Sequence, residues 1–120
     1  MKIIIVPLTL LLAGCVSSVY NYPAHIQTAY EYLGYTERDH RVELTQFLGV
    51  NPRRTEWCAA FVNGILEENN YASTRTNGTL HYLLARSYLE YGDMILQAEV
   101  QTGDIMIFTR GRSGWQGHVG

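Results

Sequence analysis

Apolar residues recur every three or four positions between residues 23 and 91, which is the period of an amphipathic α-helix. Glycine, proline and asparagine interrupt the pattern and predict where each helix ends. Four helices are therefore predicted, over residues 23–33, 37–48, 55–66 and 79–91. The apolar positions of the first helix are Ile26, Ala29, Tyr30 and Leu33. In the second and fourth helices the side chains expected to face inward are Val42, Leu44, Phe47, Leu48, Leu80, Leu83, Leu84, Tyr88 and Leu89. The third helix carries an apolar band formed by Trp57, Cys58, Phe61, Val62, Ile65 and Leu66.

The third predicted helix carries the clearest local signals. Thr55 is placed to cap its start, and the pair Asn69-Asn70 is placed to end it. Gly64 lies inside the helix, where glycine costs about 1 kcal/mol relative to alanine. Because a glycine here lowers helix stability, its presence predicts that another element packs closely against the helix at this point.

The hydrophobic pattern changes after residue 92. Gly103-Asp104 is a turn signal, and residues 105–108 form a short apolar run that is typical of a buried strand. Residues 110–117 are rich in glycine and predict a loop, and His118 opens a second predicted strand. Helices that come first and strands that follow predict an α+β domain with an antiparallel sheet.

The N-terminal segment has a different pattern. Lys2 is followed by an apolar run of about ten residues, which is too short to span a bilayer and suits a signal peptide. The run ends in Leu-Ala-Gly-Cys, which resembles a bacterial lipobox and implies that lipid is attached to Cys15. We expect a signal peptide at 1–14, a tether at 16–22 and the folded domain at 23–120. A plain secretion signal with an incidental cysteine is the alternative.

The lipobox resemblance also implies a location. Attached acyl chains anchor a protein because each buried methylene contributes about 0.8 kcal/mol. Val16, rather than aspartate, follows the lipidated cysteine, which in a host with two membranes implies sorting to the outer membrane, at its periplasmic face. The expected membrane partner is therefore reached through the lipid on Cys15.

Composition excludes some classes of partner. The chain has 120 residues, enough for one domain, and a formal net charge of −2. No basic patch of the kind that binds nucleic acid is evident in it. Nine tyrosines serve either packing or the stacking of sugars, and the sequence leaves both readings open.

Cys58 is the residue with the strongest chemical signal. If lipid occupies Cys15, the other cysteine is an unpaired thiol in an oxidising compartment, which requires either deep burial or chemistry. At the start of a helix, backbone N–H groups and the helix dipole favour a thiolate. A nucleophile also needs a base. His25, His40 and His81 lie in predicted helices and are expected to be solvated, which leaves His118 as the candidate.

Three motifs in order then resemble one family. They are Trp57-Cys-Ala-Ala-Phe-Val62, Gly103-Asp-Ile105 and Gly114-Trp-Gln-Gly-His-Val-Gly120, and the resemblance covers roughly residues 24–120. The chain is similar to the NlpC and CHAP group of papain-like cell-wall peptidases and amidases, in their phage-associated branch. The resemblance implies that Cys58 is the nucleophile, that His118 is the base, and that an amide bond of peptidoglycan is cut. It implies no cofactor.

The resemblance also suggests where substrate binds. Trp57 either lines the cleft or packs in the core, and the glycine-rich loop holding Trp115 and Gln116 either lets the substrate approach or is a simple hairpin turn. Four arginines flank the two catalytic segments, and they either meet carboxylates of a stem peptide or are solvated: Arg53, Arg54, Arg110 and Arg112. A metal site is not expected, because Cys58, His118 and one acidic residue do not make a four-ligand pattern.

Members of this family continue past the histidine, through strands that supply a third polar residue to orient the imidazole. The sequence stops inside the motif at Gly120. The expectation is therefore a fold truncated after its first strands, as a fragment of a longer product or as a short inactive form. The short form would make the protein a non-catalytic, wall-binding or structural lipoprotein.

Overall fold

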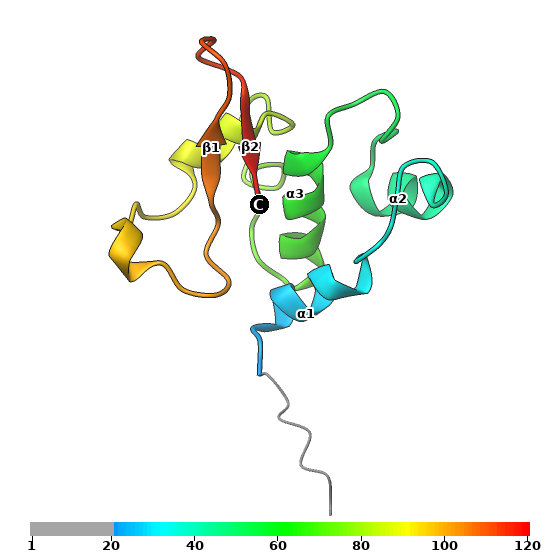
Figure 1. The fold of residues 1–120 in the computed structure, drawn as a ribbon, viewed down its shortest axis with the longest axis horizontal. Helices are drawn as coiled ribbons and strands as arrows, with labels where there is room; N and C mark the ends of the chain where they lie inside the picture. The colour runs from blue at the N-terminus through cyan, green and yellow to red at the C-terminus, as the bar shows by residue number, and fades with distance from the viewer. Residues whose placement is uncertain (1–20) are drawn as a thin grey trace, which may run out of the picture.

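The computed structural model describes residues 21–120. The predicted signal peptide, the lipidation site Cys15 and the first part of the tether lie outside these described residues. Within them, helices come first and strands last (Figure 1). The elements are α1 (Ala24–Glu31), α2 (Arg41–Leu48), α3 (Cys58–Glu68), the 3-10 helices η1 (Ala85–Glu90) and η2 (Gln97–Glu99), and the strands β1 (Ile107–Thr109) and β2 (Gly117–Val119).

Helix α3 is the centre of the fold. It contacts α1 and α2 on one side and β2 on the other, and Figure 1 shows it between α2 and the strands. Its sequence explains this position, because the small residues Ala59 and Ala60 are fully buried in different apolar clusters. Ala60 packs with Leu44 and Leu48 of α2, whereas Ala59 packs with residues of η1 and β2.

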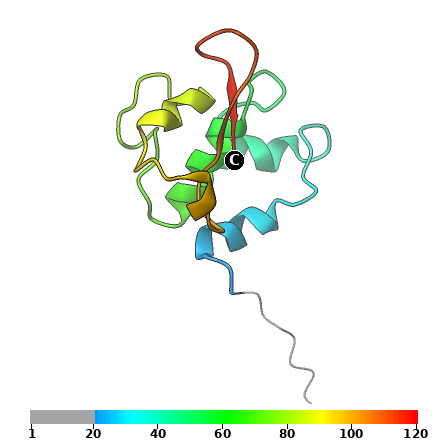
Figure 2. The ribbon, with the colours of Figure 1, turned by 60° about the vertical axis from the view of Figure 1, so that its left-hand side comes forward.

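The two strands form an antiparallel pair. Ile107 lies opposite Val119 and Phe108 lies opposite His118, and backbone hydrogen bonds between Met106 and Gly120 continue the ladder. Because side chains alternate along a strand, Val119 is buried while His118 and Phe108 are exposed. Figure 2 shows the connecting loop projecting beyond the helices. This arrangement of helices followed by an antiparallel pair confirms the α+β class.

Two predicted helix starts are wrong. The second helix begins at Arg41 rather than at residue 37, because the turn before it is held by side-chain hydrogen bonds between Thr36 and Asp39. The third begins at Cys58, with Trp57 at the capping position and no capping hydrogen bond from Thr55. Its predicted end is confirmed, because α3 stops at Glu68, before the two asparagines.

The close packing predicted at Gly64 is confirmed. A Cβ at this position would lie 2.7 Å from Cζ of Phe47, whose ring also stacks on Tyr32 and meets Phe61 edge to face. Glycine therefore allows the aromatic cluster to rest directly on the backbone of α3.

The predicted fourth helix, residues 79–91, is wrong over its first half. Residues 79–84 form turns, and only η1 follows as a 3-10 helix. Buried side chains compete with helix formation here: Asn63 and Thr74 both donate hydrogen bonds to the carbonyl of Tyr82. Leu80, predicted to face inward, is 79% exposed, and Leu89 is also exposed, whereas Tyr88 is buried as predicted.

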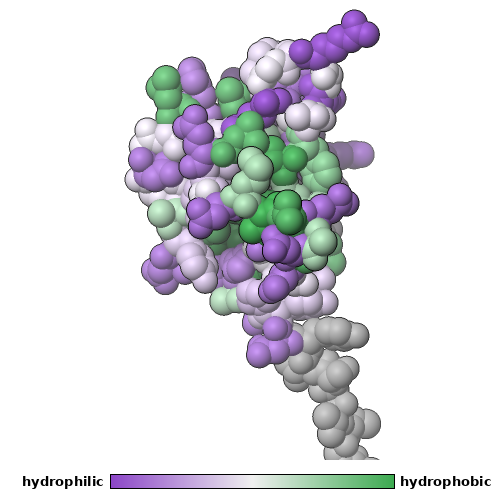
Figure 3. Space-filling view, turned by 90° about the vertical axis from the view of Figure 1, so that its left-hand side faces the viewer, coloured by the Kyte–Doolittle hydropathy of each residue, from purple (hydrophilic) through white to green (hydrophobic). Residues whose placement is uncertain are grey.

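Other apolar positions also differ from prediction. Leu33, predicted within the first helix, lies after the end of α1. Val42, predicted to face inward, is exposed. The first strand begins two residues later than predicted. Met106 before it and Phe108 within it are exposed, because η1 and α3 cover only one face of the strand pair. Figure 3 views the side of the molecule that carries β1 and η2, and apolar side chains gather there.

Candidate active site

Cys58 is the first residue of α3. The first N–H groups of an α-helix have no partner within the helix, and here no side chain in the described part of the chain caps them. The thiol is half-buried, forms no disulfide within residues 21–120, and packs against the cluster that includes Val119. The helix start therefore presents a free sulfur beside unpaired backbone donors.

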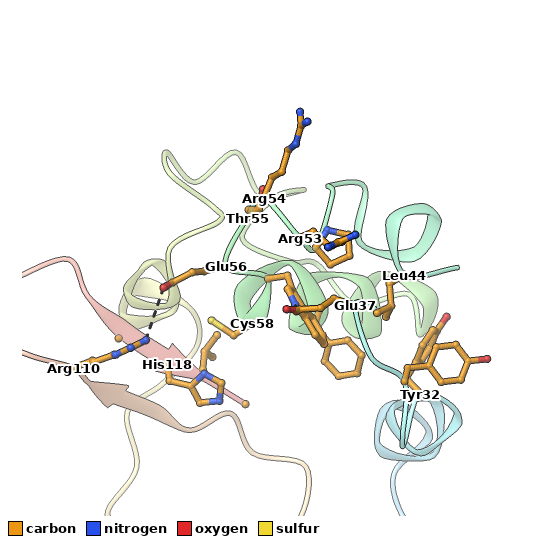
Figure 4. Close-up of a pocket in the computed structure, with 17 residues that line it drawn as sticks. Tyr32, Glu37, Leu44, Arg53, Arg54, Thr55, Glu56, Cys58, Arg110 and His118 are labelled. Carbon is orange, nitrogen blue, oxygen red and sulfur yellow. Dashed lines mark hydrogen bonds and ion pairs between the residues drawn. The ribbon is translucent and has the colours of Figure 1, made fainter. Parts of the chain in front are cut away.

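A pocket of about 770 Å³ opens in front of this helix start (Figure 4). The loop before α3, the segment between α1 and α2, and the end of β2 form its walls. Its lining residues are Tyr32, Tyr35, Glu37, Leu44, Pro52, Arg53, Arg54, Thr55, Glu56, Trp57, Cys58, Phe61, Arg110, Gly117, His118, Val119 and Gly120. The pocket therefore brings together the two residues predicted to carry the chemistry, Cys58 and His118.

His118 reaches the pocket from β2. Packing of its neighbour Val119 against the start of α3 brings the strand alongside Cys58, and His118 is exposed at the rim. Its ring stacks on Phe108 across the strand pair, with 6.5 Å between ring centroids. No hydrogen bond joins Cys58 and His118 within residues 21–120, so a proton can pass between them only after the imidazole turns or a water bridges them.

One wall of the pocket is aromatic. Trp57 contacts Phe61 edge to face, and its indole N–H donates a 2.9 Å hydrogen bond to the carboxylate of Glu37. Tyr32 meets Tyr35 and Phe61. Burial raises the pKa of Tyr32, and the nearby carboxylate of Glu68 raises it further. This wall offers a surface against which a peptide or a sugar ring can pack.

The predicted substrate-binding residues divide into two groups. Trp57 and Arg110 line the pocket, and Arg110 lies 3.8 Å from the carboxylate of Glu56. Trp115, Gln116 and Arg112 lie outside it, in the hairpin loop. A Cβ at Gly111 would lie 2.7 Å from Oε1 of Gln116, so this glutamine packs within its own loop. These three side chains therefore lie outside the pocket that holds Cys58 and His118, and their contact with a substrate stays a prediction.

Sequence reasoning missed Tyr32, Tyr35 and Glu37 as pocket residues. All three lie more than twenty positions before Cys58, and their residue types carry no motif. Only the tyrosine-rich composition gave a weak signal for an aromatic wall. The neighbouring arginines Arg53 and Arg54, whose role was left open, do line the pocket.

The other histidines occupy places that differ from prediction. His25 is half-buried on α1, and its Nε2–H donates to the carbonyl of Gly103 over 3.0 Å. His40 precedes α2 and stacks on Tyr35. His81 is solvated as predicted, but it lies in a turn with a positive φ rather than in a helix. None of the three lines the pocket.

Across the part of the chain that the structure describes, no three metal-binding side chains lie together. No helix there has both the length and the apolar character needed to cross a membrane. Comparison of the chain with protein-family models, with curated proteins and with solved structures found no match. The functional argument therefore depends on the pocket and its chemistry.

Proposed function

We propose that this protein is a cysteine peptidase or amidase, of the papain-like NlpC/CHAP type, that cuts an amide bond in peptidoglycan. One observation carries the proposal: Cys58 at the start of α3 and His118 on β2 line the same pocket. A thiol at a helix start, a histidine delivered from a separate element and an open cleft are the parts that nucleophilic cleavage of an amide needs.

The reaction follows from these parts. His118 takes the proton of the Cys58 thiol, and the thiolate attacks the carbonyl carbon of the substrate amide. Unpaired N–H groups at the start of α3 stabilise the oxyanion that forms. The C–N bond then breaks, and the amine leaves with the proton from His118. Water, activated by the neutral imidazole, adds to the thioester and releases the carboxylic acid and the free thiol.

The proposed setting is the bacterial cell envelope. The lipobox-like run before Cys15 supports anchoring through attached lipid. Catalysis would then explain why an exported protein keeps Cys58 as an unpaired thiol. An anchor at the periplasmic face of an outer membrane would place the pocket beside the wall polymer that it is proposed to cut. Both parts of this setting rest on residues 1–16 alone.

The test is digestion of isolated sacculi. The full chain in detergent is expected to release soluble wall fragments, and Cys58→Ala is expected to release none above background. Because Cys58 is only half-buried, circular dichroism should show that this variant keeps its helices. Equal release by both proteins would exclude Cys58 as the nucleophile. Sacculus binding without release by either would instead favour a non-catalytic wall-binding lipoprotein.

A further inference from the structure

The charged residues that line the pocket are not evenly paired. Three arginines and two glutamates reach it. Glu37 accepts the hydrogen bond of Trp57, and Glu56 lies in an ion pair with Arg110. The guanidinium groups of Arg53 and Arg54 have no hydrogen-bond or ion-pair partner anywhere in residues 21–120. The pocket therefore holds positive charge that the protein itself does not neutralise.

The loop that carries these arginines has a defined conformation. Pro52 is buried, the N–H of Arg53 donates to Oδ1 of Asn51 over 3.0 Å, and the N–H of Arg54 donates to the Asn51 carbonyl. An asparagine that bonds to the backbone two residues later is a standard turn-forming device. The turn fixes the backbone of Arg53 only five positions before Cys58, on the wall of the pocket.

The two arginines point in different directions. In Figure 4 the side chain of Arg54 extends outward, away from the other labelled residues, whereas that of Arg53 stays close to them. A guanidinium presents its N–H donors as a planar fork that matches the two oxygens of a carboxylate. Arg53 is thus the pocket cation best placed to receive an anionic group on a bound molecule.

We propose that Arg53 makes this site selective for peptides that carry a free carboxylate close to the amide to be cut. The aromatic wall of Tyr32 and Trp57 holds the peptide backbone, and Arg53 binds the carboxylate. A substrate in which the same carboxylate has been converted to an amide loses the charge-assisted pair and is discriminated against. The inference rests on the proposed function for the reaction, but the selectivity itself is a property of binding.

A matched pair of substrates tests this directly. One is a muramoyl stem peptide whose γ-linked D-glutamyl residue keeps its α-carboxylate, and the other is the same peptide with that carboxylate amidated. The wild-type chain in detergent is expected to cleave the acidic peptide with kcat/KM at least about tenfold higher. Arg53→Gln should bring this ratio to within about twofold, by lowering kcat/KM for the acidic peptide alone.

Arg112→Gln is the matched control, since it removes the same charge from an exposed arginine that lies outside the pocket. It should keep the wild-type preference. Arg53→Lys keeps the charge but loses the fork, so an intermediate preference is expected. Circular dichroism of each variant excludes unfolding as the cause of a loss. An unchanged preference in Arg53→Gln, or its equal loss in Arg112→Gln, would overturn the assignment.

Binding to the inactive variant separates this inference from the proposed function. Cys58→Ala should bind the acidic peptide at least about tenfold more tightly than the amidated one, and Cys58→Ala with Arg53→Gln should bind both equally. If wild type binds with this preference but cleaves neither peptide, the selectivity stands and the proposed hydrolase activity fails. If wild type cleaves both peptides equally well, the activity stands and the selectivity fails.

Discussion

The middle and the start of α3 are built in opposite ways. Around Asn63, near its middle, every polar group is used: the amide oxygen accepts hydrogen bonds from Tyr88 and from both the N–H and hydroxyl of Thr74. At the start of the helix, backbone donors are unpaired and Cys58 faces an open pocket. The saturated region holds the fold, whereas the donors at the start of the helix are left for water or a ligand to satisfy.

The hydrogen-bonded region around Asn63 continues to the end of α3. Glu67 accepts two hydrogen bonds from the guanidinium of Arg75 and one from the hydroxyl of Ser73. Arg75 also donates to the carbonyl of Leu48, which ties α3 to α2. Substitutions in this region should therefore alter stability, and substitutions at the pocket should alter activity. The predictions below test that division, from the largest expected effect to the smallest.

The largest effect is expected at the pocket rim. His118→Ala removes the only imidazole that lines the pocket in the described residues, so activity on sacculi should fall by about 10²–10⁴-fold. Stability in urea should change little, because the side chain is exposed. Trp115→Ala, in the adjoining hairpin loop but outside the pocket, should keep activity within about twofold of wild type. Equal losses in both variants would mean that the hairpin acts as a whole.

The next effect is on stability. Asn63→Ala deprives Tyr88 and Thr74 of their shared acceptor in a fully buried site, so the free energy of unfolding should fall by about 3 kcal/mol. Burial raises the pKa of Tyr88, which keeps its hydroxyl protonated and able to donate. Tyr88→Phe, which removes one donor, should cost about 1 kcal/mol. Urea unfolding followed by circular dichroism measures the free energy of unfolding of both variants. If Asn63→Ala is less destabilising than Tyr88→Phe, Asn63 is not the shared acceptor that we describe.

Gly64→Ala should have a smaller effect. The new Cβ would overlap the ring of Phe47, which costs more than the roughly 1 kcal/mol that alanine adds to helix propensity. A net destabilisation of about 1 kcal/mol is expected in the same urea assay. Combining it with Phe47→Leu should relieve the overlap, so the two changes should be less than additive. Strict additivity would contradict direct contact between these residues.

The smallest effect is a dependence on pH. Hydrogen bonds from Arg75, and then from Ser73, hold the pKa of Glu67 below its usual range. The stability from this pairing is present above the pKa of the unfolded chain and is lost as pH falls through the lower folded value. The urea midpoint should therefore decline between about pH 5 and pH 3. Glu67→Gln should be less stable at pH 7, and its urea midpoint should decline less as pH falls. If the midpoint of this variant declines as much as that of wild type, other carboxylates cause the pH dependence.

The sequence predicted the saturated core better than the pocket. Helical periodicity placed Leu44, Leu48 and Tyr88 inward, and the glycine at position 64 predicted the contact with another element. These are local signals, because burial and close packing restrict residue type at each position. Cys58 was likewise predicted in the first turn of its helix, and it is the first residue of α3.

What the sequence could not predict depends on long-range hydrogen bonds. The failure at residues 79–84 follows from buried side chains that bond to the Tyr82 carbonyl, which periodicity does not register. Asn63 itself resembles a surface residue until its three donors are located. The pocket wall formed by Tyr32 and Glu37 comes from a separate segment, so no spacing near Cys58 indicates it.

The central claim is that Cys58 attacks the substrate and carries its acyl group. The most direct measurement is mass spectrometry of the full chain mixed with a soluble muramoyl peptide, quenched in acid at early times and digested. We predict that the fragment containing Cys58 gains the mass of the acyl portion of the substrate, and that this adduct decays as product accumulates. Release of cleaved product while Cys58 remains unmodified at every time point would contradict the account.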